Sequence, residues 1–373
     1  GKIFYMFKTI LKHLFPSIKG KKQANYLYFE KDKEPVEEIQ QQTFEESKSA
    51  GPAKPLRLVS IEETHRQDFY DFLFGQSSAT AQHDELSYYV ADKIEAVLRT
   101  PNTIIEVMPV LPASLSQVID QLTDDNFDTQ ELLYLIQQEP AIAAKVIELS
   151  NSAFYNRTGK EISDLKSAFM LLGSNGLIEG VINGFVSKLT PQSQIYFKQY
   201  GNKIWHHSLT TGVISKALIN KSSYKDEAAQ GYLIGLICNL GDMIIYQLLM
   251  EAFSFIHPDH QPNSYAFKEL IQKKSKKLTY HIAKHWQFPQ SILDALALQV
   301  KLTHVSMLPA VFSKRPMACY VYEGNIISEL IMMFEHNDKT EVELREAAGI
   351  LLYSDEAKQY VEQVLAVRME QLK

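Results

Sequence analysis

The sequence is short of the features that mark several classes of protein. It has 2 cysteines in 373 residues, Cys238 and Cys319, so a disulfide framework is excluded and a reducing cytoplasm fits best. It has 16 glycines and 14 prolines, below average usage, which disfavours a many-turned all-β sandwich. Neither sign of charge dominates, and the net charge of −6 provides no general attraction for nucleic acid.

Several motifs of catalysis and of nucleic-acid recognition are also missing. There is no P-loop, no G-x-G-x-x-G and no G-x-S-x-G. Residues 164–187 have a helix–Gly–helix pattern, but the second helix has Glu179 and Lys188 as its only charges. It lacks the basic cluster that phosphate contacts require, so we expect no nucleic-acid partner.

One apolar run, residues 231–250, is long enough to cross a bilayer. Asn239 and Asp242 lie near its middle, and a central Asp costs roughly 2.5 to 3.5 kcal/mol on insertion scales. We therefore expect a buried helix at the centre of a globular core, not a membrane span.

What the sequence does contain is helical periodicity. Apolar residues recur at helical spacing in every long apolar segment, and no alternating run of any length occurs. Pro140 suits the first turn of one helix, Asp164 can cap another, and Gly173 is well placed to end it. The sequence predicts an all-α protein.

Composition divides the chain into four segments. Residues 1–55 begin with a basic amphipathic helix over 3–18 and continue as an acidic, polar tether and linker. Residues 56–105 are expected to be a helical extension, 106–300 the main domain and 301–373 a second helical extension. The helix over 3–18 is expected to pack on this protein or a second copy in a homo-oligomer. Peripheral attachment to an anionic membrane surface is the alternative.

Two local patterns could carry chemistry but are incomplete. His281 and His285 have the i,i+4 spacing that can bind zinc, but no third ligand is identifiable nearby. Cys238 could act as a nucleophile with His207, but its apolar neighbours would raise the thiol pKa and make it inert. We expect neither to be a functional site.

A series of motifs in the right order resembles the HDOD domains, the HD-related output domains of bacterial signalling proteins. The similar segments are MPVLP at 108–112, IQQEPA at 136–141, LSNSAFY at 149–155, ISDLKSAFMLLG at 162–173, Trp205 with His207 and Ser208, GLI at 235–237, and WQFP at 286–289. The resemblance covers residues 106–300 and implies a helical HD-like core with helical extensions at both ends.

The departures from the family pattern bear on function. In catalytic HD phosphohydrolases, histidines and an adjacent His-Asp pair hold one or two metals that activate water. The corresponding positions implied by the resemblance form a degenerate site: His207, Cys238, Asn239, Asp242, Ser275 and Gln299 with Val300. Cys238-Asn239 replaces the His-Asp pair, so His207 is the one ligand left. A lone imidazole cannot fix a divalent metal in an open catalytic geometry.

The resemblance therefore implies a non-catalytic signalling module without metal or other cofactor. It would act through contacts with other signalling proteins, and Cys238 and Asn239 would be packing and hydrogen-bonding residues inside a helix. One alternative is a metal-dependent HD phosphohydrolase acting on a nucleotide or cyclic dinucleotide. Another is a small-ligand sensor with a cleft near Trp205, His207 and Asn239.

Overall fold

The computed structural model describes residues 60–76, 85–106, 129–137, 140–152, 155–189, 202–256 and 264–371. Within these ranges all regular secondary structure is helical, which confirms the predicted all-α class. The helix expected over residues 3–18, with the tether and linker up to residue 55, lies outside the described residues.

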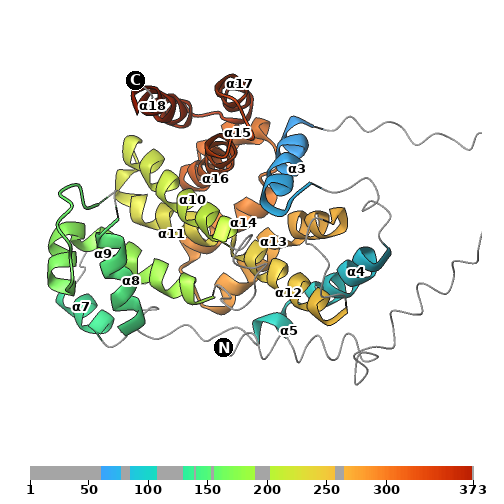
Figure 1. Ribbon diagram of the computed structural model, residues 1–373, viewed down its shortest axis with the longest axis horizontal. Coiled ribbons are helices and arrows are strands. Elements are labelled where there is room, and N and C mark those ends of the chain that lie inside the picture. Colours follow the sequence, from blue (N-terminus) through green and yellow to red (C-terminus); the bar gives the residue numbers. More distant parts are fainter. Residues whose placement is uncertain are drawn as a thin grey trace, which may run out of the picture.

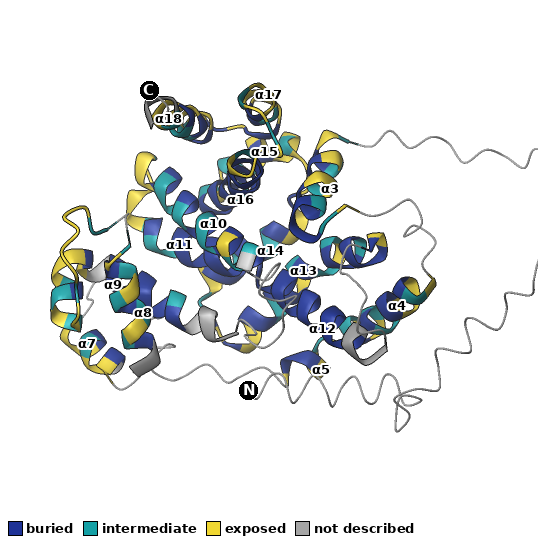
Figure 2. Cartoon of the chain, in the orientation of Figure 1, coloured by how far each residue is buried: buried dark blue, intermediate teal, exposed yellow. Residues whose placement is uncertain are grey.

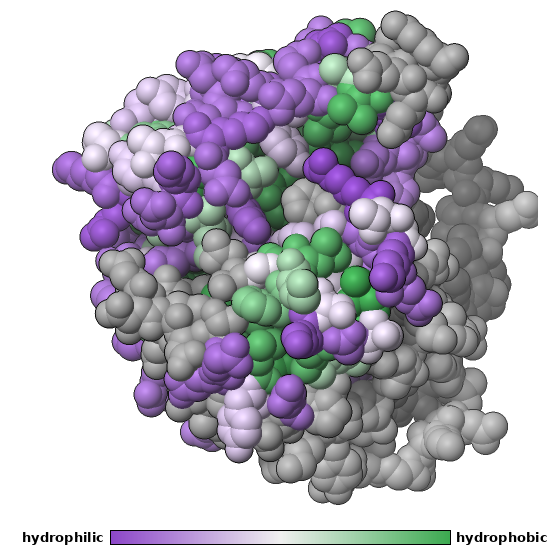
Figure 3. All heavy atoms as spheres, turned by 90° about the vertical axis from the view of Figure 1, so that its left-hand side faces the viewer, coloured by the Kyte–Doolittle hydropathy of each residue, from purple (hydrophilic) through white to green (hydrophobic). Residues whose placement is uncertain are grey.

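The first described helices lie around the periphery of the molecule (Figure 1). They are α3 (Ile61–Phe74), α4 (Glu85–Arg99), α5 (Asn102–Ile105), α7 (Thr129–Gln137), α8 (Pro140–Ser150) and α9 (Leu165–Leu189). Helices α7, α8 and α9 pack together at the left in Figure 1. That end faces the viewer in Figure 3, where apolar surface lies among hydrophilic side chains.

The punctuation expected in this group of helices is present. Helix α8 begins at Pro140. The Asp164 carboxylate accepts a hydrogen bond from the Ser167 backbone N–H at 2.8 Å, as an N-cap does. Gly173 interrupts α9 with φ 67° and ψ −177°, a left-handed φ that an L side chain rarely adopts.

The middle of the molecule is the most buried part (Figure 2). It is built from α10 (Asn202–Lys221), the short η4 (Lys225–Glu227), α11 (Ala228–Ile237), α12 (Leu240–Ile256), α13 (Tyr265–His285), α14 (Gln290–Lys301) and α16 (Pro316–Glu335). Helix α10 packs between α11 and α16, and α12 packs along α13. The remaining elements cover one side: η5 (Val305–Met307), α15 (Leu308–Phe312), α17 (Glu341–Leu351) and α18 (Asp355–Gln371).

The long apolar run lies in this core. The stretch Lys225–Ala252 is long and apolar enough to cross a membrane, and its most hydrophobic window is entirely buried. The expectation of one continuous helix is wrong, because the run divides into α11 and α12 at Cys238 and Asn239. At the break the Asp242 N–H bonds to the backbone carbonyl of Asn239, three residues back instead of the four of an α-helix, at 3.1 Å.

The turn between α11 and α12 brings two backbones into contact. A Cβ atom on Gly241 would lie 2.0 Å from the Ser275 carbonyl oxygen of α13. The Gly241 N–H donates to the Thr279 hydroxyl at 2.9 Å. Helix α13 therefore approaches the turn as closely as a glycine allows.

Helix α3 precedes the HDOD-like region in sequence but packs on the central helices. Its Phe69 and Phe74 are among the largest fully buried side chains, and Phe74 stacks on Tyr246 with ring centroids 5.1 Å apart. Lys268 of α13 holds its C-terminal end, donating to the Asp71 carboxylate and to the Gly75 carbonyl at 2.6 Å each. Helix α3 thus forms one wall of the space between it and the central helices.

Candidate functional site

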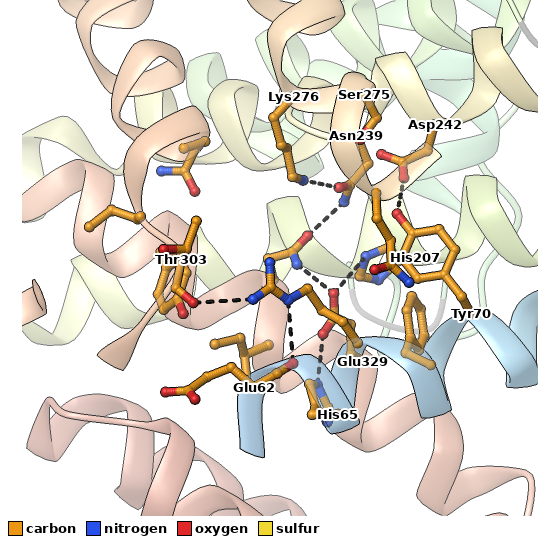
Figure 4. A pocket seen from close by; sticks show the side chains of 18 of the residues that line it. Glu62, His65, Tyr70, His207, Asn239, Asp242, Ser275, Lys276, Thr303 and Glu329 are labelled. Atoms are coloured by element: carbon orange, nitrogen blue, oxygen red, sulfur yellow. Dashed lines mark hydrogen bonds and ion pairs between the residues drawn. The ribbon is translucent and has the colours of Figure 1, made fainter. Parts of the chain in front are cut away.

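Beneath α3 lies a cleft of about 140 Å³, bounded also by α10, α12, α13, α14 and α16 and termed here the central cleft (Figure 4). The side chains that give it its chemistry are Tyr70 of α3, His207, Asn239, Asp242, Lys276 and Glu329.

The structure brings most of the degenerate HD-site positions together. His207, Asn239, Asp242, Ser275 and Gln299 all line the central cleft, as does Val300. Cys238 is buried beside it, and its Sγ lies 3.2 Å from the Gly235 carbonyl oxygen.

Other residues singled out in the sequence lie elsewhere. Trp205, on α10, is half-buried and does not line the central cleft, so the expected grouping of Trp205 with His207 and Asn239 is incomplete. His281 and His285 of α13 are also outside it. Burial and the lysines beside it lower the pKa of His281.

A chain of hydrogen bonds crosses the cleft from α13 to α3. The Lys276 ammonium donates to the Asn239 side-chain oxygen. The Asn239 amide donates to Asn325 Oδ1 at 2.8 Å, and the Asn325 amide donates to Glu329 Oε1 at 2.7 Å. Glu329 Oε2 lies 2.7 Å from His65 Nε2 (Figure 4). The Asn239 side chain, expected at the position of an HD aspartate, is therefore bonded to protein partners on both sides.

His207 is held as a neutral imidazole. Burial lowers its pKa to about 4, although the nearby Glu329 carboxylate opposes this shift. Its Nδ1 lies 2.8 Å from the Ser328 hydroxyl, which itself donates to the His207 carbonyl at 3.3 Å. The Ser328 hydroxyl thus fixes one edge of the ring, and the other nitrogen, Nε2, lies 3.9 Å from Glu329 Oε1.

Two buried carboxyl groups in the cleft have pKa values shifted in opposite directions. Burial alone would raise the pKa of Glu329, but the hydrogen bond to His65 and the nearby positive charges lower it below the ordinary value. Burial raises the pKa of Asp242, although Lys276 opposes this. Tyr70 donates its hydroxyl to Asp242 Oδ1. Asp242 Oδ2 is buried and has no hydrogen-bond partner within the described part of the chain.

The donor set does not fit the metal of the HD phosphohydrolases. Burial raises the pKa of the Cys238 thiol to about 11, so it is protonated at neutral pH. Asn239 supplies a neutral amide, and Lys276 adds a positive charge beside it. Across the described ranges, no group of three or more His, Cys, Asp and Glu side chains is arranged to hold a metal ion.

Part of the site comes from residues that the sequence reasoning did not single out. His65 and Tyr70 are on α3, and Asn325 and Glu329 are on α16. The sequence carried one signal for α16: Glu329 is the only charged residue in the apolar run IISELIMMF at 326–334. No comparable signal marks α3, whose role depends on its position over helices far away in the sequence.

Comparisons with known proteins agree with the fold. The model of the HDOD domain family matches residues 108–302. The crystal structure of an HDOD domain protein of unknown function from Geobacter sulfurreducens is similar with a TM-score of 0.52 and 16% identity, covering 74% of this chain and 96% of that one. A structure from Shewanella amazonensis SB2B, provisionally named a phosphohydrolase, has a TM-score of 0.49 and 16% identity, covering 72% of this chain and 94% of that one.

An uncharacterized protein of Treponema pallidum (strain Nichols) is 20% identical over 229 residues, which are 60% of this chain. The match spans 41% of that relative, less than half its length. The motifs, the helical architecture and the family match over more than half of the residues lead to one conclusion: this chain belongs to the HDOD domain family.

Proposed function

We propose that this protein is a non-catalytic signalling or regulatory module that works through protein–protein contacts. The observation that carries the proposal is the chain of hydrogen bonds from Lys276 to His65 across the central cleft. HD-type hydrolysis needs a metal that lowers the pKa of water and neutralises developing charge. An amide, a protonated thiol and an ammonium group are poor substitutes for the ligands of such a metal.

The test is elemental analysis of the full chain, purified after expression in medium supplied with iron, manganese and zinc. We expect no stoichiometric metal. We also expect hydrolysis of bis(4-nitrophenyl) phosphate at the same background rate for the wild type and for His207→Ala, with each metal added in turn.

A metal-dependent phosphohydrolase would give the opposite result. About one metal per chain, lost in His207→Ala, together with hydrolysis that depends on that metal, would overturn the proposal. It would instead favour a metal-dependent HD phosphohydrolase acting on a nucleotide or a cyclic dinucleotide. A His285→Ala variant, changed on the exposed part of α13, is the matched control for metal lost non-specifically.

The contacts proposed for this module include other signalling proteins and a second copy of the chain. The basic amphipathic helix that the sequence predicts over residues 3–18 would supply one such contact in the cytoplasm. Salt-sensitive binding to vesicles rich in anionic lipid, lost when residues 1–22 are deleted, would favour peripheral membrane attachment through that helix instead.

A further inference from the structure

We infer that the central cleft binds a small zwitterion of amino-acid size, with Lys276 for its anionic end and Asp242 for its ammonium end. The inference rests on the proposed function, because it gives the signalling module an input. It depends on three features of the cleft: its size, a buried acceptor without a partner among the described residues, and a half-buried lysine at its wall.

Size sets the class of ligand. The cleft measures about 140 Å³. A cavity of about 150 Å³ engineered in another protein holds one benzene molecule, which has six heavy atoms. Alanine also has six heavy atoms, whereas a nucleotide has several times more. The space beneath α3 therefore suits a small metabolite, and a nucleotide would have to extend out of the cleft.

Asp242 supplies the unsatisfied acceptor. Its side chain is 6% exposed, lines the cleft, and uses Oδ1 to accept the Tyr70 hydroxyl. Its Oδ2 is buried without a hydrogen-bond partner among the described residues. Buried polar atoms in native proteins are usually paired, so an unpaired one at a cavity wall marks a place for a donor. Burial also raises the Asp242 pKa, and an arriving ammonium group would favour the ionised form.

Lys276 supplies the donor. An ammonium group has three N–H donors. Among the described residues, half-buried Lys276 donates to the Asn239 side-chain oxygen and to the Cys238 carbonyl at 3.2 Å, so a third N–H remains for solvent or a ligand. The cleft is also lined by Arg66, Lys273 and Lys277 and by the carboxyl groups of Glu62 and Glu329, so groups of both signs face a ligand. Figure 4 shows Lys276 and Asp242 on neighbouring walls of the same space.

A molecule that satisfies both groups carries a carboxylate and an ammonium within a few atoms of each other. A simple anion would leave Asp242 Oδ2 unpaired, and a simple amine would meet the charge of Lys276. Water would satisfy the same atoms without any charge requirement. The binding test therefore has to compare zwitterions with molecules that carry only one of the two groups.

The experiment measures the Tm of the full chain with glycine, L-alanine or L-serine, and with propionate or ethylamine as single-group controls. We expect at least one of the amino acids to raise Tm by about 5 °C at a hundredfold excess over its Kd. Propionate and ethylamine should produce no comparable shift. Calorimetric titration of the wild type then gives the Kd.

Two variants test which residue binds which end of the zwitterion. Asp242→Asn and Lys276→Met should each weaken binding by at least about tenfold, because each removes a hydrogen bond to a charged group. Lys284→Met, on the exposed part of α13 and outside the cleft, should bind like the wild type. If a variant does not fold, the wild-type comparison of zwitterions with single-group molecules still decides.

Three results would overturn the inference. No shift with any amino acid means that the cleft holds water only, and the proposed non-catalytic function would be untouched. An equal shift with propionate means a simple anion site. Tight binding of a cyclic dinucleotide, with metal-dependent hydrolysis, would contradict both this inference and the proposed function.

Discussion

Lys276 donates a hydrogen bond to Asn239, the residue that the sequence motifs align with the aspartate of the His-Asp pair in catalytic HD proteins. In those relatives a metal supplies the positive charge at this place. Here a lysine of α13 supplies a positive charge beside a neutral amide. A neutral amide at this position is consistent with a neighbouring lysine, because the lysine already supplies a positive charge there.

Replacing Lys276 by Met should destabilise the protein by about 1–3 kcal/mol. The change leaves the Asn239 side-chain oxygen and the Cys238 carbonyl without the donor that they share. Urea unfolding measures the difference. Lys284→Met, at an exposed position of the same helix, should stay within about 0.5 kcal/mol of the wild type, and equal losses in the two variants would contradict this account.

His207 should make stability depend on pH in a defined window. Burial lowers its pKa to about 4, whereas an unfolded chain has an ordinary histidine pKa of about 6.5. The unfolded state therefore binds the proton first as pH falls. The stability contributed by neutral His207 is complete above about pH 6.5 and is lost as pH falls toward 4.

His207→Asn should flatten this dependence between pH 6.5 and 4, as measured by urea unfolding at several pH values. His285→Gln, at an exposed position of α13, should keep the wild-type slope. The depressed pKa of Glu329 adds a further loss of stability at lower pH, as that carboxylate is protonated. A His207→Asn slope identical to that of the wild type would show that His207 is not buried in its neutral form.

Both thiols should be inert in the folded protein. Burial raises the pKa of Cys238 to about 11 and that of Cys319 to about 12. At pH 8 we expect a thiol reagent to react with each at least about a hundredfold more slowly than with free cysteine, and with both at once after unfolding in urea. Rapid labelling of Cys238 in the native state would bring back the nucleophile hypothesis.

Replacing Gly241 and Gly349 by alanine should change the stability of the protein in opposite directions. A Cβ on Gly241 would meet the Ser275 carbonyl, so Gly241→Ala should cost about 3 kcal/mol or more. Gly349 lies in α17 with nothing within 4 Å of an added Cβ, and Gly349→Ala should stabilise by about 0.4–1 kcal/mol. Thermal unfolding distinguishes them, and a neutral Gly241→Ala would mean that α13 can move away from the turn.

The sequence predicted the helical class because the helix signals are local. Asp164 and Gly173 mark a helix cap and a break, and both act where expected. The interruption at Cys238 and Asn239 was visible as two residues of unusual character in an apolar run. Periodicity alone did not predict that it separates two helices, because the turn depends on the close approach of α13 at Gly241.

The candidate site was predictable only as far as the family pattern extends. That pattern located His207, Asn239 and Asp242, which line the cleft. It carried no information on His65 or Glu329, since both lie outside the matched residues 108–302. Their pairing joins positions 264 residues apart, and neither side chain reveals its partner by spacing.

The packing of α16 against α10 and α11 has a consequence for how the protein is made. The apolar stretch Lys225–Ala252 leaves the ribosome before α16, which follows it in the chain, has been synthesised. Until then its hydrophobic surface is open to chaperones and to other nascent chains. A polypeptide that ends at Leu302 would contain the residues matched by the family model but would lack α16, which packs on α10 and α11. We therefore expect it to aggregate in the cell.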